Sequence, residues 1–202
     1  YANFSADDLT GKEENKLSLQ QEMGLPQDPD VPMISIISRL VPQKGLDLIQ
    51  EVIDELLQED IQFVMLGTGN QEYEDMFRRI AEEYPAKVAV NISYDGDLAQ
   101  KIYASSDMFL MPSKYEPCGL SQLISFRYGT IPIVRETGGL NDTVVAYNEE
   151  TGEGTGFSFS DYNAHDMLHT IERAVSFYDK KGIWNKLVNR VMNLNYSWHN
   201  SA

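Results

Sequence analysis

The sequence predicts an α/β fold in which a parallel β-sheet carries helices on both faces. Short apolar runs alternate along the chain with longer segments that have helical spacing, and no internal repeat or low-complexity tract interrupts this order. Several of the apolar runs end in glycine-rich or charged stretches. Strands that alternate with helices form βαβ crossovers, which align the strands in parallel and place the helices on the faces of the sheet.

The predicted strands are short and apolar, as strands buried on both faces are. They span residues 32–38, 61–67, 88–92, 107–111, 130–134 and 156–159. Pro132 lies in the fifth strand, which indicates either a sheet edge or a strand start, because proline donates no ladder hydrogen bond.

The predicted helices repeat apolar residues at intervals of three and four. In residues 45–58 these positions are Leu46, Leu48, Ile49, Val52, Ile53, Leu56 and Leu57. The helices span residues 12–23, 45–58, 71–84, 97–104, 120–128, 163–178 and 182–194. Together with the strands they predict a Rossmann-like sheet.

The bulk composition fits one soluble domain, because the 202 residues are 42% apolar and 23% charged. We expect an N-terminal helix and linker in residues 1–31, the α/β core in residues 32–195, and a truncated C-terminal segment in residues 196–202. No apolar run of transmembrane length and no signal peptide is visible. The lone Cys118 cannot form an internal disulfide, so we expect a cytoplasmic location.

The charge of the chain bears on its partners. A formal net charge of -15 argues against nucleic acid and anionic membranes, which bind basic surfaces. Arg39 and Lys44 run against this acidic background, in a loop that opens a helix at Gly45. They suit a diphosphate, since Arg clamps phosphate bidentately and Lys supplies a point charge. The alternative is a surface loop with two solvated cations.

Three further strand ends carry residues suited to binding. Gly67-Thr68-Gly69 suits a ribose or phosphate, or forms only a tight turn. Glu116 lies in a turn ahead of a helix, where a carboxylate can orient sugar hydroxyls and the next N–H groups can face a phosphate. Thr137-Gly138-Gly139 can form an anion-binding nest or a plain glycine-rich loop. Because ligands bind at the carboxyl ends of strands in such sheets, the four strand ends together predict one site.

Other chemistry finds little support. His165, His169 and His199 have no Cys or carboxylate partners at ligand spacing, so we expect no metal site. No P-loop motif is present, and Gly67-Thr68-Gly69 lacks the third glycine of a dinucleotide fingerprint. Cys118 is interpreted as a packing residue because no base lies beside it in the sequence. We expect no cofactor.

The combined motifs resemble those of the bacterial glycogen synthases and plant starch synthases. The matching segments are FSADDLTGK at 4–12, SRL at 38–40, QKGLD at 43–47, PSKYEPCGL at 112–120, TGGL at 137–140, DTV at 142–144 and YSW at 196–198. The resemblance covers nearly the whole chain. It implies the C-terminal half of a retaining glycosyltransferase of GT-B fold, which adds glucose from ADP-glucose to the non-reducing end of an α-1,4-glucan.

The resemblance also implies roles for individual residues. Arg39 and Lys44 would hold the diphosphate and stabilise the departing ADP, Glu116 would lie by the donor glucose, and Tyr94 would lie beside the adenine. Departure and attack would occur on the same face of the sugar. N–H groups of Cys118, Gly119 and Leu120 would orient glucose hydroxyls, and Thr137, Gly138 and Gly139 would line the phosphate. The other nucleotide-binding residues would be Gly67, Thr68, Gly69 and Leu140.

Two departures from the wider pattern matter. Ile124 stands where many retaining GT-B enzymes carry a second Glu, which fits the synthase branch. The chain also lacks an initiator Met and the N-terminal acceptor domain with its Lys-x-Gly-Gly-Leu motif, and it stops at Ala202 before the last helix of the family. We therefore expect a fragment that binds the donor and is inactive by itself.

Three alternatives remain open on the sequence alone. The chain could serve a transferase that uses UDP-glucose or GDP-mannose, since the base-recognition residues are poorly defined. It could act only as a nucleotide-binding module, or as a scaffold domain that binds no nucleotide.

Overall fold

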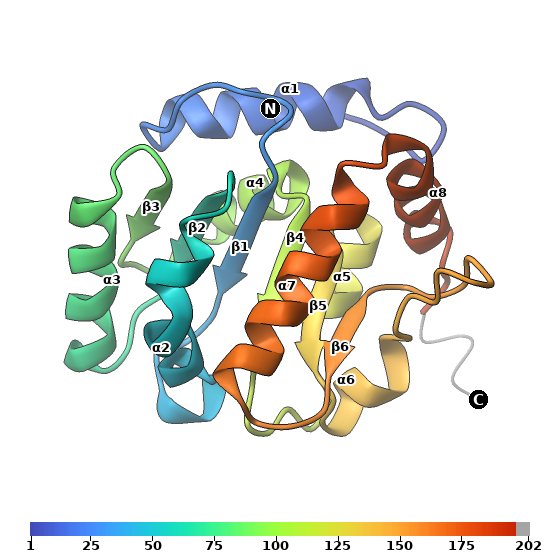
Figure 1. Ribbon diagram of the computed structural model, residues 1–202. Helices are drawn as coiled ribbons and strands as arrows, with labels where there is room; N and C mark the ends of the chain where they lie inside the picture. The colour runs from blue at the N-terminus through green and yellow to red at the C-terminus, as the bar shows by residue number, and fades with distance from the viewer. Residues whose placement is uncertain (197–202) are drawn as a thin grey trace.

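The computed structural model describes residues 1–196 and contains a six-stranded sheet whose named strands all pair in parallel (Figure 1). The strand order is β3-β2-β1-β4-β5-β6, the order of a doubly wound Rossmann sheet. The prediction of a parallel Rossmann-like sheet is therefore confirmed. The strands are β1 (Met33–Ile37), β2 (Gln62–Leu66), β3 (Val88–Asn91), β4 (Met108–Met111), β5 (Ile131–Arg135) and β6 (Phe157–Phe159).

Helices cover both faces of this sheet. In Figure 1, α2 and α7 cross in front of the strands and α4 lies behind them. Within residues 1–196 the helices are α1 (Thr10–Glu22), the 3-10 helix η1 (Pro42–Lys44), α2 (Leu46–Leu56), α3 (Gln71–Glu83), α4 (Gly96–Ser105), α5 (Ser121–Arg127), α6 (Gly138–Thr143), α7 (Ala164–Tyr178) and α8 (Lys181–Met192).

The apolar side chains of β1 and β2 alternate between two hydrophobic clusters. Ile34 and Ile36 of β1 lie in the larger cluster, which also contains the buried faces of α2 and α7. Met33 lies in the smaller cluster, together with Leu19 of α1 and Ile102 of α4. Both faces of the sheet are therefore covered, which explains why the strands appear in the sequence as continuous apolar runs.

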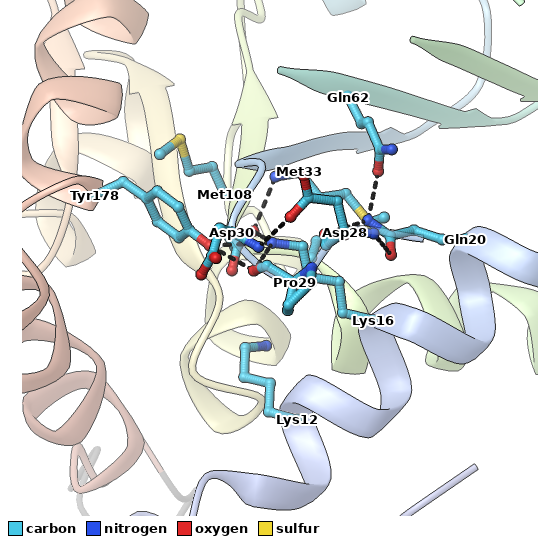
Figure 2. A network of polar contacts seen from close by, with 12 residues as sticks. Lys12, Lys16, Gln20, Asp28, Pro29, Asp30, Met33, Gln62, Met108 and Tyr178 are labelled. Atoms are coloured by element: carbon cyan, nitrogen blue, oxygen red, sulfur yellow. Dashed lines mark hydrogen bonds and ion pairs between the residues drawn. The ribbon is translucent and has the colours of Figure 1, made fainter. Parts of the chain in front are cut away.

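A buried ion pair fastens α1 to the end of the sheet where β1 and β4 begin. Lys16 Nζ lies 2.8 Å from Asp107 Oδ2 and donates to the Pro29 carbonyl and the Tyr178 hydroxyl at 2.9 and 3.0 Å (Figure 2). The same Asp107 oxygen accepts the N–H of Met33 at 2.8 Å. These contacts join α1 to the starts of two neighbouring strands, and they leave the carboxyl edge of the sheet open.

The strand order creates a crevice at that carboxyl edge. β1 and β4 are neighbours, with β2 and β3 on one side and β5 and β6 on the other. The connections that leave β1 and β4 therefore turn in opposite directions. In open α/β sheets, ligands bind at this switch point.

Two details differ from expectation. Pro132 pairs with Phe109, and β5 lies between β4 and β6, so the edge-strand alternative is wrong; Pro132 is instead the second residue of its strand. The helices η1 and α6 were predicted as loops, because three and six residues are too few to show a helical period. Within residues 1–196, no helix has the length and apolar character needed to cross a bilayer. Ser197, Trp198 and His199, with most of the C-terminal segment, lie outside the described residues.

Candidate active site

A pocket of about 230 Å³ lies at the switch point between β1 and β4. We call it the switch-point pocket; its lining residues are Ile36, Ile37, Ser38, Arg39, Lys44, Leu110, Met111, Pro112, Ser113, Glu116, Leu120 and Ser121. The first and third predicted strand ends therefore meet here. The sequence-predicted residues Arg39, Lys44, Glu116 and Leu120 share one cavity.

An ion pair crosses the switch-point pocket. Lys44 Nζ lies 2.9 Å from Glu116 Oε2, and the two side chains are 19% and 14% exposed. The hydroxyl of Ser113 donates to the same carboxylate oxygen at 3.2 Å. Within residues 1–196, the other oxygen of Glu116, Oε1, accepts no hydrogen bond. One oxygen of this carboxylate is thus held, and the other is available to a ligand.

Arg39 is the second cation of the site. Its side chain is exposed and lines both the switch-point pocket and a second pocket beside it. Among the described residues, its guanidinium has no hydrogen-bond or ion-pair partner. It is therefore free to bind an anion that spans the two pockets.

Backbone contacts fix the loops that carry these side chains. Gly45 adopts a φ of 77°, and a Cβ there would lie 2.0 Å from the carbonyl oxygen of Pro112, so only glycine fits. The N–H of Lys114 donates to the Gln43 carbonyl at 2.9 Å, and Gln43 Nε2 donates to the Tyr115 carbonyl at 3.2 Å. The loops after β1 and β4 are therefore joined at three points.

The second pocket, of about 220 Å³, lies beside the first, at the ends of β1 and β2. It is lined by Ile37, Ser38, Arg39, Leu66, Gly67, Thr68, Ser93, Tyr94, Asp95 and Gly96. Tyr94 is 96% exposed, so its ring is open to a planar ligand. We call this cavity the Tyr94 pocket.

Two donors of the Gly67-Thr68-Gly69 turn are engaged within the protein. The Thr68 hydroxyl and the Gly69 N–H both donate to Glu74 Oε1, at 2.7 and 3.0 Å. These bonds, that from Thr68 first, lower the pKa of the Glu74 carboxyl from its ordinary value. The donors expected to reach a ribose or phosphate are thus already engaged. Gly67 is required for packing, since its Cβ would lie 2.1 Å from the Ser38 carbonyl oxygen.

The turn ahead of α5 keeps its donors open. No N–H of Cys118, Gly119 or Leu120 has an acceptor in the part of the chain that the structure describes. Cys118 is exposed, and Gly119 has a φ of 64°. Gln122, which the sequence analysis passed over, is buried and supports this turn by donating to the Cys118 carbonyl at 3.3 Å.

Gly138 and Gly139, which follow β5, pack closely against the turn that carries Glu116. The Gly139 N–H donates to the Glu116 carbonyl at 3.1 Å, and a Cβ on Gly139 would lie 2.0 Å from the Cys118 carbonyl oxygen. A Cβ on Gly138 would lie 2.2 Å from the Glu116 carbonyl oxygen. Of the three N–H groups expected to form the nest, those of Thr137 and Gly138 lack an acceptor within residues 1–196, and that of Gly139 has one.

Leu140, the last of the predicted nucleotide-binding positions, has a buried side chain. It is 0% exposed and belongs to the large hydrophobic cluster. Its N–H donates to the Thr137 carbonyl at 3.1 Å. The side chain of Leu140 therefore anchors α6 to the core.

Within residues 1–196, no three or more His, Cys, Asp or Glu side chains gather where they could hold a metal ion. His165 Nε2 instead lies 3.3 Å from Glu55 Oε1, with both side chains more than half exposed.

The model of the family "Glycosyl transferases group 1" matches residues 20–186. The chain belongs to this family. The glycosyltransferase chain is 60% identical to a glycogen synthase from Clostridium novyi and 57% identical to one from Bacillus cereus strain Q1, in each case over its full length and 42% of the relative. It thus spans less than half the length of these curated relatives.

Solved structures confirm the GT-B fold of this group 1 glycosyltransferase. The catalytic domain of starch synthase IV from Arabidopsis thaliana, bound to ADP and acarbose, superposes with a TM-score of 0.92 at 40% identity, over 98% of this chain and 42% of that one. A C-terminal domain of a group 1 glycosyl transferase from Francisella tularensis shares the fold alone, with a TM-score of 0.70 at 15% identity, over 89% of this chain and 90% of that one.

Proposed function

We propose that the chain is the donor-binding domain of a glycogen synthase, which moves glucose from ADP-glucose to the non-reducing end of an α-1,4-glucan with retention of configuration. The observation that carries the proposal is the convergence of Arg39, Lys44 and Glu116 at the switch-point pocket. The 60% identity to a glycogen synthase and the ADP bound to the similar starch synthase IV support the choice of donor.

The two cations act on the leaving group. When the bond between glucose C1 and the diphosphate breaks, negative charge grows on the departing oxygen. Arg39 and Lys44 stabilise that charge in a preorganised, partly buried site. The 4-hydroxyl of the glucan forms the new bond to C1 on the face from which ADP departs. Its proton passes to the leaving phosphate oxygen, and ADP carries away the electron pair.

Glu116 acts on the sugar. Its free oxygen, Oε1, accepts hydrogen bonds from hydroxyls of the glucose. The negative charge of the carboxylate stabilises the oxocarbenium-like centre that forms at C1. The N–H groups of Cys118, Gly119 and Leu120 orient the other hydroxyls. The held oxygen, Oε2, keeps the carboxylate in place.

The nucleotide occupies the neighbouring Tyr94 pocket. The adenine stacks on Tyr94, because an exposed aromatic ring suits a base. Gly67 lines the same pocket, and the free N–H groups of Thr137 and Gly138 face a phosphate. Thr68 lines this pocket too, with its hydroxyl held by Glu74. Gly69, Gly139 and Leu140 support the loops of the site through their own contacts.

The remainder of the enzyme supplies the acceptor site. Since the chain spans 42% of its glycogen synthase relatives, the glucan binds across the cleft to a second domain, and the chain alone transfers no glucose. The single cysteine, Cys118, is a free thiol, which supports a cytoplasmic location. The net charge of -15 supports a function without nucleic acid.

The test is calorimetric titration of the chain with ADP and with UDP, repeated on Arg39→Ala and Lys44→Ala. We expect ADP to bind at least about tenfold more tightly than UDP, and both variants to lose at least about tenfold in affinity, since each removes a charge-assisted contact. Lys101→Ala is the control, because Lys101 lines neither the switch-point pocket nor the Tyr94 pocket and pairs with exposed Glu22. Equal binding of UDP would favour another donor, and no binding at millimolar concentration would refute a donor site.

A further inference from the structure

We propose that Ser113 is a positioning residue for Glu116, and that it holds the carboxylate in place while Lys44 engages the donor diphosphate. This inference rests on the proposed function, because it assigns Glu116 to the sugar and Lys44 to the phosphates. Ser113 is not among the site residues that the sequence motifs predict.

The first step is the geometry of the hydroxyl. Ser113 is 2% exposed, and its Oγ lies 3.2 Å from Glu116 Oε2. Among the residues that the structure describes, Glu116 is the one hydrogen-bond partner of this hydroxyl. A buried hydroxyl with a single carboxylate acceptor is oriented by it, since leaving the donor unpaired would cost free energy.

The second step is that the backbone around Glu116 is already fixed. Its carbonyl accepts the N–H of Gly139 at 3.1 Å, and the N–H of Lys114 is held by the Gln43 carbonyl at 2.9 Å. What remains free is the side chain of Glu116, with its rotatable torsions. Two donors, Ser113 Oγ and Lys44 Nζ, restrain it, and both act on Oε2. Oε1 therefore faces the substrate.

The third step is a competition for Lys44. A diphosphate that enters the switch-point pocket brings strong acceptors for the ammonium, so the ion pair with Glu116 weakens as the donor binds. Ser113 is neutral and gains no comparable attraction to the phosphates. It is then the remaining restraint on Oε2 at the moment of transfer. Loss of Ser113 should thus slow turnover and leave donor affinity nearly unchanged.

The experiment uses the full-length enzyme and measures incorporation of glucose from ADP-glucose into glycogen. Ser113→Ala should lower kcat about tenfold, which corresponds to ~1.4 kcal/mol, while the dissociation constant of ADP changes less than about twofold. Ser113→Thr keeps the hydroxyl and should recover most of the rate. In a Glu116→Gln background, Ser113→Ala should cause little further loss, because the two residues act as a unit.

Ser125→Ala is the matched control. Ser125 is equally buried, but its hydroxyl donates to the Ser121 carbonyl at 2.7 Å and does not reach Glu116, so its kcat should stay near wild type. Given an active wild-type enzyme, the inference is overturned if Ser113→Ala keeps the wild-type kcat or if Ser113→Ala loses ADP affinity instead of kcat. It is also overturned if Ser113→Thr is as slow as Ser113→Ala. If wild-type enzyme transfers no glucose from ADP-glucose, it is the proposed function that fails.

Discussion

Lys44 and Glu116 lie 72 positions apart in the chain, and their Nζ and Oε2 atoms lie 2.9 Å apart in the folded protein. The pair joins the loop after β1 to the turn after β4 across the switch point of the sheet. It gives each charge a partner when no donor is bound. The proposed donor must therefore replace Glu116 as the anion that faces Lys44.

The Lys44–Glu116 pair should stabilise the chain measurably. Both side chains are less than a fifth exposed, so Lys44→Met leaves a carboxylate partly desolvated with Ser113 as its remaining partner. We expect a loss of about 1.5–3 kcal/mol in the free energy of unfolding, as for hydrogen bonds to charged groups. Urea denaturation of Lys44→Met, Glu116→Gln and the double variant gives the coupling energy.

Lys101→Met is the control for this cycle. Lys101 and Glu22 also form an ion pair, at 3.2 Å, but their side chains are 36% and 41% exposed. Such exposed pairs contribute about 0–1 kcal/mol. Equal losses in the two variants, or no coupling between Lys44 and Glu116, would mean that the pocket pair adds no stability.

Gly139→Ala should damage the site by displacing the Glu116 turn. The new Cβ would lie 2.0 Å from the Cys118 carbonyl oxygen, and a backbone atom at that distance must move. We expect a loss of about 1–3 kcal/mol in stability, as for overpacked positions, together with weaker ADP binding. Urea denaturation and calorimetry of the chain measure both.

Gly182→Ala provides the opposite case. Gly182 lies in α8, and no atom apart from its chain neighbours and its own helix backbone would lie within 4 Å of its Cβ. Alanine should therefore stabilise the helix by up to about 1 kcal/mol. ADP affinity should not change. If Gly139→Ala behaved like Gly182→Ala, the glycine would be needed for neither packing nor binding.

The fold could be predicted from the sequence because buried positions follow a regular pattern of apolar residues. The sheet is covered on both faces, so each strand is a short apolar run, and helices such as α2 repeat their buried residues at intervals of three and four. The loop positions of Arg39, Lys44 and Glu116 followed from the rule that ligands bind at the carboxyl ends of parallel strands. The structure then brought these three residues to one pocket.

The finer site depends on contacts that spacing does not encode. Thr68 and Gly69 were predicted to face a ligand, but Glu74, from the first turn of the next helix, takes both donors. A Ser113-x-x-Glu116 spacing was visible in the sequence, yet nothing there said that the hydroxyl would be buried against that carboxylate. The sequence placed Gly139 in an anion-binding nest. In the structure its lack of a side chain leaves room for the Cys118 carbonyl oxygen of the turn after β4.

Tyr94→Ala should reduce nucleotide affinity without affecting the fold. The ring is 96% exposed, so its removal should change stability by less than about 0.5 kcal/mol. A base stacked on an aromatic ring gains about 1–3 kcal/mol, so ADP should bind roughly tenfold or more weakly in calorimetry. Val145→Ala, at another exposed apolar residue, should leave ADP binding unchanged. If Tyr94→Ala bound ADP like wild type, the adenine would lie elsewhere.

Lys12 should make stability depend on pH. It lies buried in α1, and its Nζ donates to the carbonyls of Ala104 and Tyr128 at 3.2 and 2.8 Å and to the Thr130 hydroxyl at 3.0 Å. Figure 2 shows it on the same helix as Lys16, away from the Lys16 network. Within residues 1–196 its hydrogen-bond acceptors are all uncharged and no carboxylate forms an ion pair with it, so the ammonium is desolvated without a charged partner in direct contact.

Burial lowers the pKa of Lys12 from 10.5 to about 7; the carboxylate of Asp107 opposes this shift, and the charge of Lys16 adds to it. Between these values the unfolded chain binds the proton and the folded chain does not. The free energy of unfolding should therefore rise with pH over this interval, by up to about 1.4 kcal/mol per pH unit. Urea denaturation between about pH 7.5 and 9.5 should show that Lys12→Met removes this rise. Any pH dependence of the unfolding free energy that both proteins share comes from other titrating groups. Equal slopes would mean that Lys12 titrates in the folded protein as it does in the unfolded chain.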